Sequence, residues 1–237
     1  MSRAFGTTTL DGVVATFRDG LARAAATEPA RFDRPGCTVS GEPARRGSGT
    51  VAVWGLGRHV LVRADPDLVP RLGGLAGRAR TTIDEVADAV AAGFAGRPGS
   101  RTGATAVLVL HATGLRRPTP PAGIEVRALD RTRVGAIDAS GRLAAIGRRR
   151  RWPLDPRFAA LRLRTRPTAR GAGIGPAVGA ALVDAAVRDG YLPQCVAPAR
   201  DGAGSRGRPG LASSLGFRQV ATWVDLEVHP PGSAGGP

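Results

Sequence analysis

The alternation of apolar and polar positions predicts a chain of mixed helices and strands. Residues 160–166 alternate strictly, with Leu161, Leu163 and Thr165 on one face and three arginines on the other. The segment Pro176–Arg188 has apolar residues at helical spacing and is followed by Gly190, which predicts a helix and its end. Further strands are expected at 124–129, 134–138, 143–148, 192–197 and 222–228, and a short helix ends within 213–217. The pattern indicates an α/β fold built on a mixed sheet.

The first 114 residues read as a smaller α/β region. Apolar residues from Leu10 to Leu21 have helical spacing, and residues 49–62 read as a hairpin around a Gly-Leu-Gly turn. Thr82 and Glu85 form a capping-box signature before a helical stripe, and 106–110 reads as a strand. This part contains no recognisable catalytic motif.

A proline-rich connector at 115–123 gives the clearest boundary, because it can continue neither a helix nor a central strand. We therefore expect an N-terminal α/β region at 1–114, a linker at 115–123, a second domain at 124–230 and a disordered tail at 231–237.

Composition indicates a soluble globular protein of the cytoplasm. Apolar residues make up 42% of the chain, yet no apolar run reaches the roughly 18–20 residues that a membrane span needs. The start lacks the pattern of a secretory signal. Cys37 and Cys195 lie far apart, which suits a reducing compartment and excludes a zinc-binding pattern. No metal site is expected.

The net charge of +15 has two interpretations. With the abundant Ala, Gly and Pro it is typical of the composition that a GC-rich genome produces, with no ligand involved. The functional interpretation is a polyanionic partner, either a nucleic acid or a phosphorylated cofactor. All 34 basic residues are arginines. With 4% aromatic residues the chain offers few platforms for stacking bases, which weighs against nucleic acid. The run Arg148–Arg151 is the best candidate phosphate contact, and the alternative interpretation is a solvated strand end.

The segment Arg170-Gly-Ala-Gly-Ile-Gly175 follows a strand and opens a helix. A glycine-rich loop at that place presents unpaired backbone N–H groups and the positive end of the helix dipole, which suits a pyrophosphate. The motif alone is weak evidence, because Arg71–Ala76 fits a looser form of it without the helix. The alternatives are a glycine turn packed on the sheet, or a dinucleotide-binding loop, for which Pro176 stands where glycine is needed.

With this strand, loop and helix, and with Leu211–Phe217 before a closing strand, residues 124–228 resemble the GNAT acetyltransferase family. The first 110 or so residues resemble loosely the extra N-terminal region of some bacterial members. The resemblance implies a GNAT-like acyl-CoA-binding fold whose strand before the loop parts from its neighbour to hold acetyl-CoA. It implies cofactor contacts, mostly through the main chain, at Leu163, Thr165, Arg170, Gly171, Ala172, Gly173, Ile174 and Gly175.

The sequence departs from that family at the acceptor side. The helices that usually separate the first two strands are missing, since Val134 follows soon after Leu129. The tyrosine that often serves as general acid would fall at Ala212, and the chain's tyrosine is Tyr191. The asparagine often found before that helix aligns with Ser205. In that family the strand before the loop often offers a carboxylate as general base, but here that face carries Leu161, Leu163 and Thr165. Asp138, Asp155 and Glu125 are the nearby acids, and an ordinary role in a loop or on a strand surface is the alternative for each.

Three functions follow as alternatives. The first is an acetyl-CoA-dependent N-acetyltransferase that acts on an unidentified amine by direct attack on the thioester. The second is a GNAT-fold module that binds the cofactor without turnover. The third, ranked last, is a nucleic-acid-binding protein. No membrane partner is expected.

Overall fold

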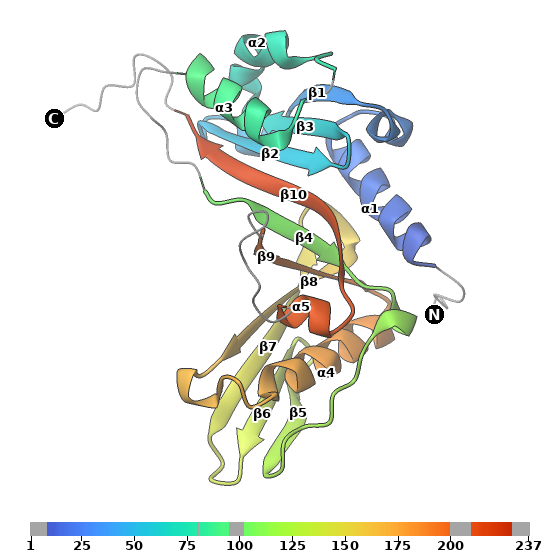
Figure 1. Ribbon diagram of the computed structural model, residues 1–237, viewed down its shortest axis with the longest axis vertical. Helices are drawn as coiled ribbons and strands as arrows, with labels where there is room; N and C mark the ends of the chain where they lie inside the picture. The colour runs from blue at the N-terminus through green and yellow to red at the C-terminus, as the bar shows by residue number, and fades with distance from the viewer. Residues whose placement is uncertain (1–8, 80, 95–101, 200–209, 229–237) are drawn as a thin grey trace, which may run out of the picture. The chain divides into compact units, whose positions relative to one another are not determined.

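The computed structural model describes residues 9–79, 81–94, 102–199 and 210–228. Their helices and strands are α1 (Leu10–Ala24), β1 (Gly36–Gly41), β2 (Thr50–Leu56), β3 (His59–Ala64), α2 (Val69–Leu72), α3 (Ile83–Gly93), β4 (Thr105–Val109), β5 (Ile124–Asp130), β6 (Arg133–Asp138), β7 (Leu143–Trp152), β8 (Asp155–Thr165), α4 (Ile174–Arg188), β9 (Leu192–Pro198), α5 (Leu211–Ser214) and β10 (Arg218–Glu227) (Figure 1).

The chain divides into two compact units. The C-terminal unit comprises the described parts of Met1–Phe17, Val107–Ala197 and Asp201–Gln219. The N-terminal unit comprises Arg18–Ala106, Pro198–Arg200 and Val220–Pro237, again in their described parts. This division differs from the predicted boundaries at 114 and 124, because each unit contains segments from both ends of the sequence. The predicted tail and Ser205 lie outside the described residues.

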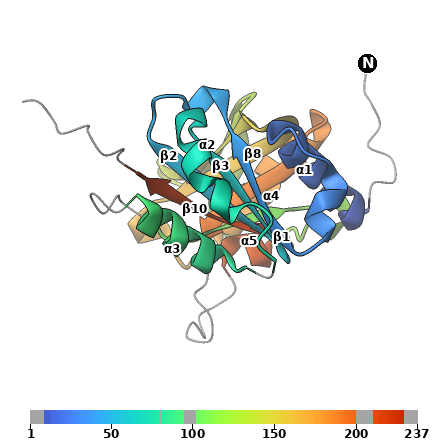
Figure 2. The same ribbon diagram turned by 90° about the horizontal axis from the view of Figure 1, so that it is seen from above.

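The N-terminal unit contains a four-stranded sheet in the order β1-β3-β2-β10. The predicted hairpin is confirmed as β2 and β3, which pair antiparallel from Val51↔Ala64 to Leu56↔His59. Strand β1 was not predicted and runs parallel to β3. Helices α2 and α3 lie on the same face of β2 and β3 (Figure 2), where their apolar residues pack against the strand valines. The predicted capping box of α3 is confirmed, since Thr82 and Glu85 bond to each other's backbone N–H groups.

The sheet of the C-terminal unit has the order β4-β9-β8-β7-β6-β5. Strands β5 to β8 form an antiparallel meander, and β9 runs parallel to β8. Only Arg131 and Thr132 separate β5 from β6, so the predicted absence of intervening helices is confirmed. The residues predicted as a linker are fixed to this unit: the Arg116 N–H bonds to the Leu215 carbonyl at 3.1 Å, and Arg117 pairs with Asp184.

Helix α4 covers one face of this sheet (Figure 1). Gly147 of β7 makes the close approach possible, because a Cβ at this position would lie 3.0 Å from Leu182 Cδ2 and 3.2 Å from Val178 Cγ1. On the opposite face the part of α1 that ends at Phe17 packs near the β7–β8 turn. The Phe17 ring stacks on Trp152 at 5.2 Å between centroids and meets Phe158 edge-on. The sheet is therefore covered on both faces at its β7–β8 end.

Both units combine helices with mixed parallel and antiparallel strands, which confirms the predicted α/β class. Among the described residues, no helix is long and apolar enough to cross a membrane.

Candidate functional site

Strands β8 and β9 part halfway along their length. They pair in parallel over four positions, from Phe158↔Leu192 to Leu161↔Cys195. Strand β8 then continues to Thr165 and keeps its ladder with β7, but residues 162–165 have no partner in β9. The backbone groups on that edge of β8 therefore have no strand partner and are available to a ligand, with the Thr165 carbonyl oxygen already 3.5 Å from Arg170 Nε. This is the parting that the resemblance to the GNAT family implies.

The loop Arg170–Gly175, called the glycine loop below, joins β8 to α4. Gly171 has a φ of 81° and Gly173 a φ of 78°, conformations that favour glycine. Gly173 is the N-cap of α4, which begins at Ile174, so the last two residues of the predicted motif belong to the helix. No backbone N–H from Gly171 to Gly175 bonds to another described residue. Several donors are thus available at the positive end of a 15-residue helix.

The structure brings Leu163, Thr165 and Gly175 together. A Cβ placed on Gly175 would lie 3.4 Å from both Leu163 Cδ2 and Thr165 Oγ1, and 3.8 Å from Leu211 Cδ1. Arg170 is exposed, and its Nε lies 3.5 Å from the Thr165 carbonyl oxygen. Gly171, Ala172 and Gly173 are exposed as well, whereas Ile174 is buried beneath the loop. Seven of the eight predicted residues are thus at least partly exposed, and Ile174 is buried.

The acids considered from the sequence all have structural partners, and none of them lies in the unpaired segment 162–165. Asp138 accepts hydrogen bonds from the Ser140 hydroxyl and from the Ser140 and Arg142 N–H groups, which together lower its pKa. Asp155 is buried and bonds to Arg157 at 2.7 Å. Glu125 is an exposed residue of β5, 3.9 Å from Arg127. These acids therefore stabilise turns and strands.

The other groups weighed from the sequence are also placed. Tyr191 contacts the guanidinium groups of Arg149 and Arg151, and Ala212 lies in α5. His111 bonds to Thr113, and His59 is buried in the N-terminal unit between Thr38 and the Arg34 carbonyl. No group of three or more metal-ligating side chains occurs in the described part of the chain.

Gln194 is a residue that the sequence did not single out. It pairs with Ala160 at the base of the parting, is 1% exposed, and donates from Nε2 to the Cys195 carbonyl at 3.4 Å. Its Oε1 is buried and has no hydrogen-bond partner among the described residues. A buried acceptor left unpaired costs free energy, so Gln194 marks a polar position at the point where the strands separate. The sequence signal that could have identified this position was a glutamine within the predicted strand Leu192–Ala197.

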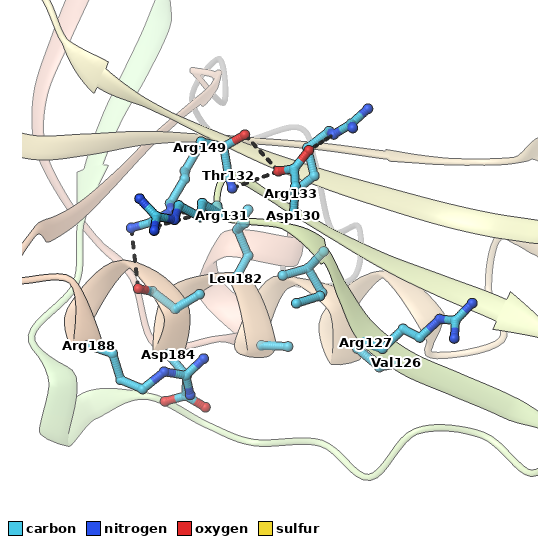
Figure 3. Close-up of a pocket in the computed structure, with 14 residues that line it drawn as sticks. Val126, Arg127, Asp130, Arg131, Thr132, Arg133, Arg149, Leu182, Asp184 and Arg188 are labelled. Atoms are coloured by element: carbon cyan, nitrogen blue, oxygen red, sulfur yellow. Dashed lines mark hydrogen bonds and ion pairs between the residues drawn. The ribbon is translucent and has the colours of Figure 1, made fainter.

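A cavity of about 240 Å³ lies at the other end of α4 (Figure 3). Its walls are the β5–β6 hairpin and the last two turns of α4, beside Arg149. Arg149 is buried there, bonds to the Arg131 and Ala185 carbonyls and pairs with Asp189. None of its lining residues belongs to the glycine loop, and the first of them in α4, Ala181, follows Gly175 by about 9 Å along the helix axis at about 1.5 Å per residue, so the cavity is not part of the predicted cofactor site.

The sequence matches no protein-family model and no curated protein. Solved structures of GNAT acetyltransferases are similar to part of the chain. A GNAT-family acetyltransferase from Colwellia psychrerythraea is 16% identical, with a TM-score of 0.41 over 55% of this chain and 57% of that one. GCN5-related N-acetyltransferases from Kribbella flavida and Sphaerobacter thermophilus are 19% and 13% identical, with TM-scores of 0.43 and 0.46. The Kribbella match covers 58% of this chain and 61% of that one, and the Sphaerobacter match 69% and 66%. The chain thus spans less than two thirds of these proteins' length, and its function has to be argued from its own geometry.

Proposed function

We propose that the chain is an acetyl-CoA-dependent N-acetyltransferase that holds acetyl-CoA between the parted strands β8 and β9 and the glycine loop. The observation that carries the proposal is the parting itself, which leaves residues 162–165 without a neighbouring strand directly before a helix N-terminus. A bound molecule with an amide-containing arm and an anionic end matches both features.

The residues present fit the two parts of acetyl-CoA. The unpaired N–H groups from Gly171 to Gly175 would donate to the pyrophosphate, and Arg170 would add charge at the rim. The backbone of Leu163 and Thr165 would bond to the amides of the pantetheine arm. Gly175 leaves the space beside Leu163 and Thr165 unfilled, because a Cβ there would be in van der Waals contact with both.

The transfer needs few groups from the protein. The amine nitrogen attacks the thioester carbonyl carbon, the C–S bond breaks, and the thiolate leaves while the amine loses a proton. Positioning of the two reactants supplies much of such an acceleration. Gln194 lies at the base of the parting, but its side chain is buried and is not presented to an incoming amine. The proton then passes to water, since Asp138 and Asp155 are engaged elsewhere.

Calorimetric titration with acetyl-CoA tests the binding step. We expect the wild type to bind and Gly173→Asp to bind at least about tenfold more weakly, because a carboxylate at the loop repels the pyrophosphate. Gly141→Asp is the matched control, since Gly141 also has a positive φ, of 76°, but lies in the open β6–β7 turn. No heat at millimolar acetyl-CoA, or equal binding by Gly173→Asp and wild type, would refute the proposal.

A second candidate is a cofactor-binding module without turnover. The two-residue β5–β6 turn and Ala212 favour it, because they leave the acceptor side without its usual helices and general acid. This candidate predicts calorimetric binding of acetyl-CoA but no release of free thiol when a broad panel of amines is added. Several turnovers per protein with any amine would exclude it in favour of the acetyltransferase.

A further inference from the structure

The face of the C-terminal unit's sheet that lies opposite α4 carries a row of arginines. Leu163 and Gly147 face α4, so the alternation of strands places Arg162 and Arg164 of β8, and Arg148 and Arg150 of β7, on the other face. All four side chains are exposed. These four residues are called the arginine face below.

Strand register makes this surface a line of charge. Arg148 and Arg162 are directly opposite each other, Arg164 stands opposite Ile146, and Arg150 stands opposite Ala160. At about 3.3 Å per residue, the line from Arg164 through the central pair to Arg150 is roughly 13 Å long. The arginine face is therefore extended along the strands, and the ion pair of Arg133 with Asp130 lies beside it, opposite Arg148 on β6.

Like charges directly opposite on neighbouring strands destabilise a sheet. Several other arginines of the C-terminal unit have carboxylate partners: Arg117 with Asp184, Arg133 with Asp130, Arg149 with Asp189 and Arg157 with Asp155. The four residues of the arginine face have no ion pair or side-chain hydrogen bond with any described residue. No described side chain offsets this repulsion, and a bound anion would relieve it.

The run Arg148–Arg151 divides between different environments. Arg149 points toward α4 and is buried with Asp189, and Arg151 Nε bonds to the Tyr191 hydroxyl at 3.1 Å. Only Arg148 and Arg150 remain free, and they join Arg162 and Arg164 from the next strand. Neither the sequence run nor a simple count of arginines identifies this set, because the strand pairing creates it.

We propose that the arginine face is a docking surface for the phosphate backbone of a nucleic acid. A line of arginines matches a chain of regularly spaced phosphates, and such contacts supply most of the affinity of non-specific binding. An acidic protein fits less well, because protein interfaces depend on buried apolar and aromatic anchors and are depleted of charge at their centre. Trp152 and Phe158 are buried against Phe17 and cannot stack on bases, so we expect little sequence preference.

Fluorescence anisotropy with labelled 20-nucleotide single-stranded RNA, single-stranded DNA and duplex DNA tests this surface. The variant replaces Arg148, Arg150, Arg162 and Arg164 by Gln. The matched control replaces four exposed arginines elsewhere, Arg34, Arg46, Arg58 and Arg116, and so has the same net charge. Thermal melting of both variants checks that they fold. The three probes show which form of nucleic acid supplies the phosphates.

We expect the arginine-face variant to lose at least about tenfold in affinity for the preferred probe, and the control to lose much less. The slope of log K against log salt should fall by about 3 to 4 in the arginine-face variant, one for each lost phosphate contact. Equal losses in both variants, or no binding of any probe by the wild type at low salt, would overturn the proposal. So would binding of polyglutamate, but not nucleic acid, that depends on these four arginines. None of these results depends on acetyl-CoA binding.

Discussion

Gly216 lies against the carbonyl group of Gly114, so close that a Cβ on Gly216 would overlap the Gly114 oxygen. The φ of Gly216 is 96°, a conformation that few side chains adopt. This contact joins the end of α5 to the segment that leads from β4 to β5, next to the hydrogen bond between Arg116 and Leu215.

Gly216→Ala is therefore expected to destabilise the protein by at least about 3 kcal/mol, the combined cost of backbone strain and overlap with rigid backbone. Gly141→Ala is the comparison, since Gly141 has a φ of 76° but no atom within 4 Å of its Cβ position. It should lose only about 1 to 2 kcal/mol. Urea unfolding measures both, and equal losses would show that the overlap is relieved by a backbone shift.

Arg148 and Arg149 are adjacent in sequence but should differ in their effect on stability. Arg149→Ala removes a buried guanidinium that bonds to the Arg131 and Ala185 carbonyls and to Asp189, so we expect a loss of about 2 to 3 kcal/mol. Arg148→Ala removes an exposed side chain, and its effect should stay within about 0.5 kcal/mol. Chemical denaturation of the two single variants gives the comparison. A loss for Arg148→Ala as large as for Arg149→Ala would contradict the assignment of faces.

The run of four arginines shows which features of the strands can be predicted from local sequence. Strict alternation predicts the faces of β8 correctly, and the same rule would have divided Arg148–Arg151 had β7 been predicted to extend to Trp152. Instead the predicted strand ended at 148, because consecutive charged residues resemble an exposed strand end. Strand β1 was missed since it is short and has glycine at both ends. It is stabilised by parallel pairing with β3, a long-range contact that local pattern does not encode.

The candidate site was predictable only in part, because local pattern indicates the glycine loop but not the strand pairing beside it. The glycine loop follows from local sequence, because glycines, a strand and a helix occur in a recognisable order. The parting of β8 from β9 came from the resemblance alone, since the apolar pattern of β9 does not show where its pairing stops. Gln194 escaped notice because a single glutamine in a strand gives no sign of burial.

The β5–β6 turn should respond to acid. A hydrogen bond from the Thr132 N–H, together with Arg133, lowers the pKa of Asp130 from 3.8 to about 2. Because the pKa is depressed in the folded state, the stabilisation is fully present above the ordinary value and is lost as the pH falls through about 2. Carboxyl carbon chemical shifts followed by NMR would give the pKa directly. A midpoint near 3.8 would contradict the turn geometry, and Arg133→Gln should move the midpoint upward.

Both thiols should be slow to react in the folded protein. Burial raises the pKa of Cys195 to about 12 and that of Cys37 to about 11, so little thiolate is present at pH 8. We expect a disulfide reagent to label neither residue rapidly until guanidinium is added, after which both thiols of the chain react. Rapid labelling of Cys195 in native buffer would show that the base of the parted strands is more open than its burial indicates.

The parting of β8 and β9 has a consequence for cooperativity. Beyond Leu161 the hydrogen-bond ladder between these two strands is interrupted. The backbone of β8 and that of β9 can therefore fluctuate independently of each other there. A molecule that bonded to both strands would act as the missing strand and restore a continuous ladder. Its binding would then raise the melting temperature by mass action and also sharpen the unfolding transition. Exchange of the backbone amides would then slow in both β8 and β9, because the two strands would open as one cooperative unit.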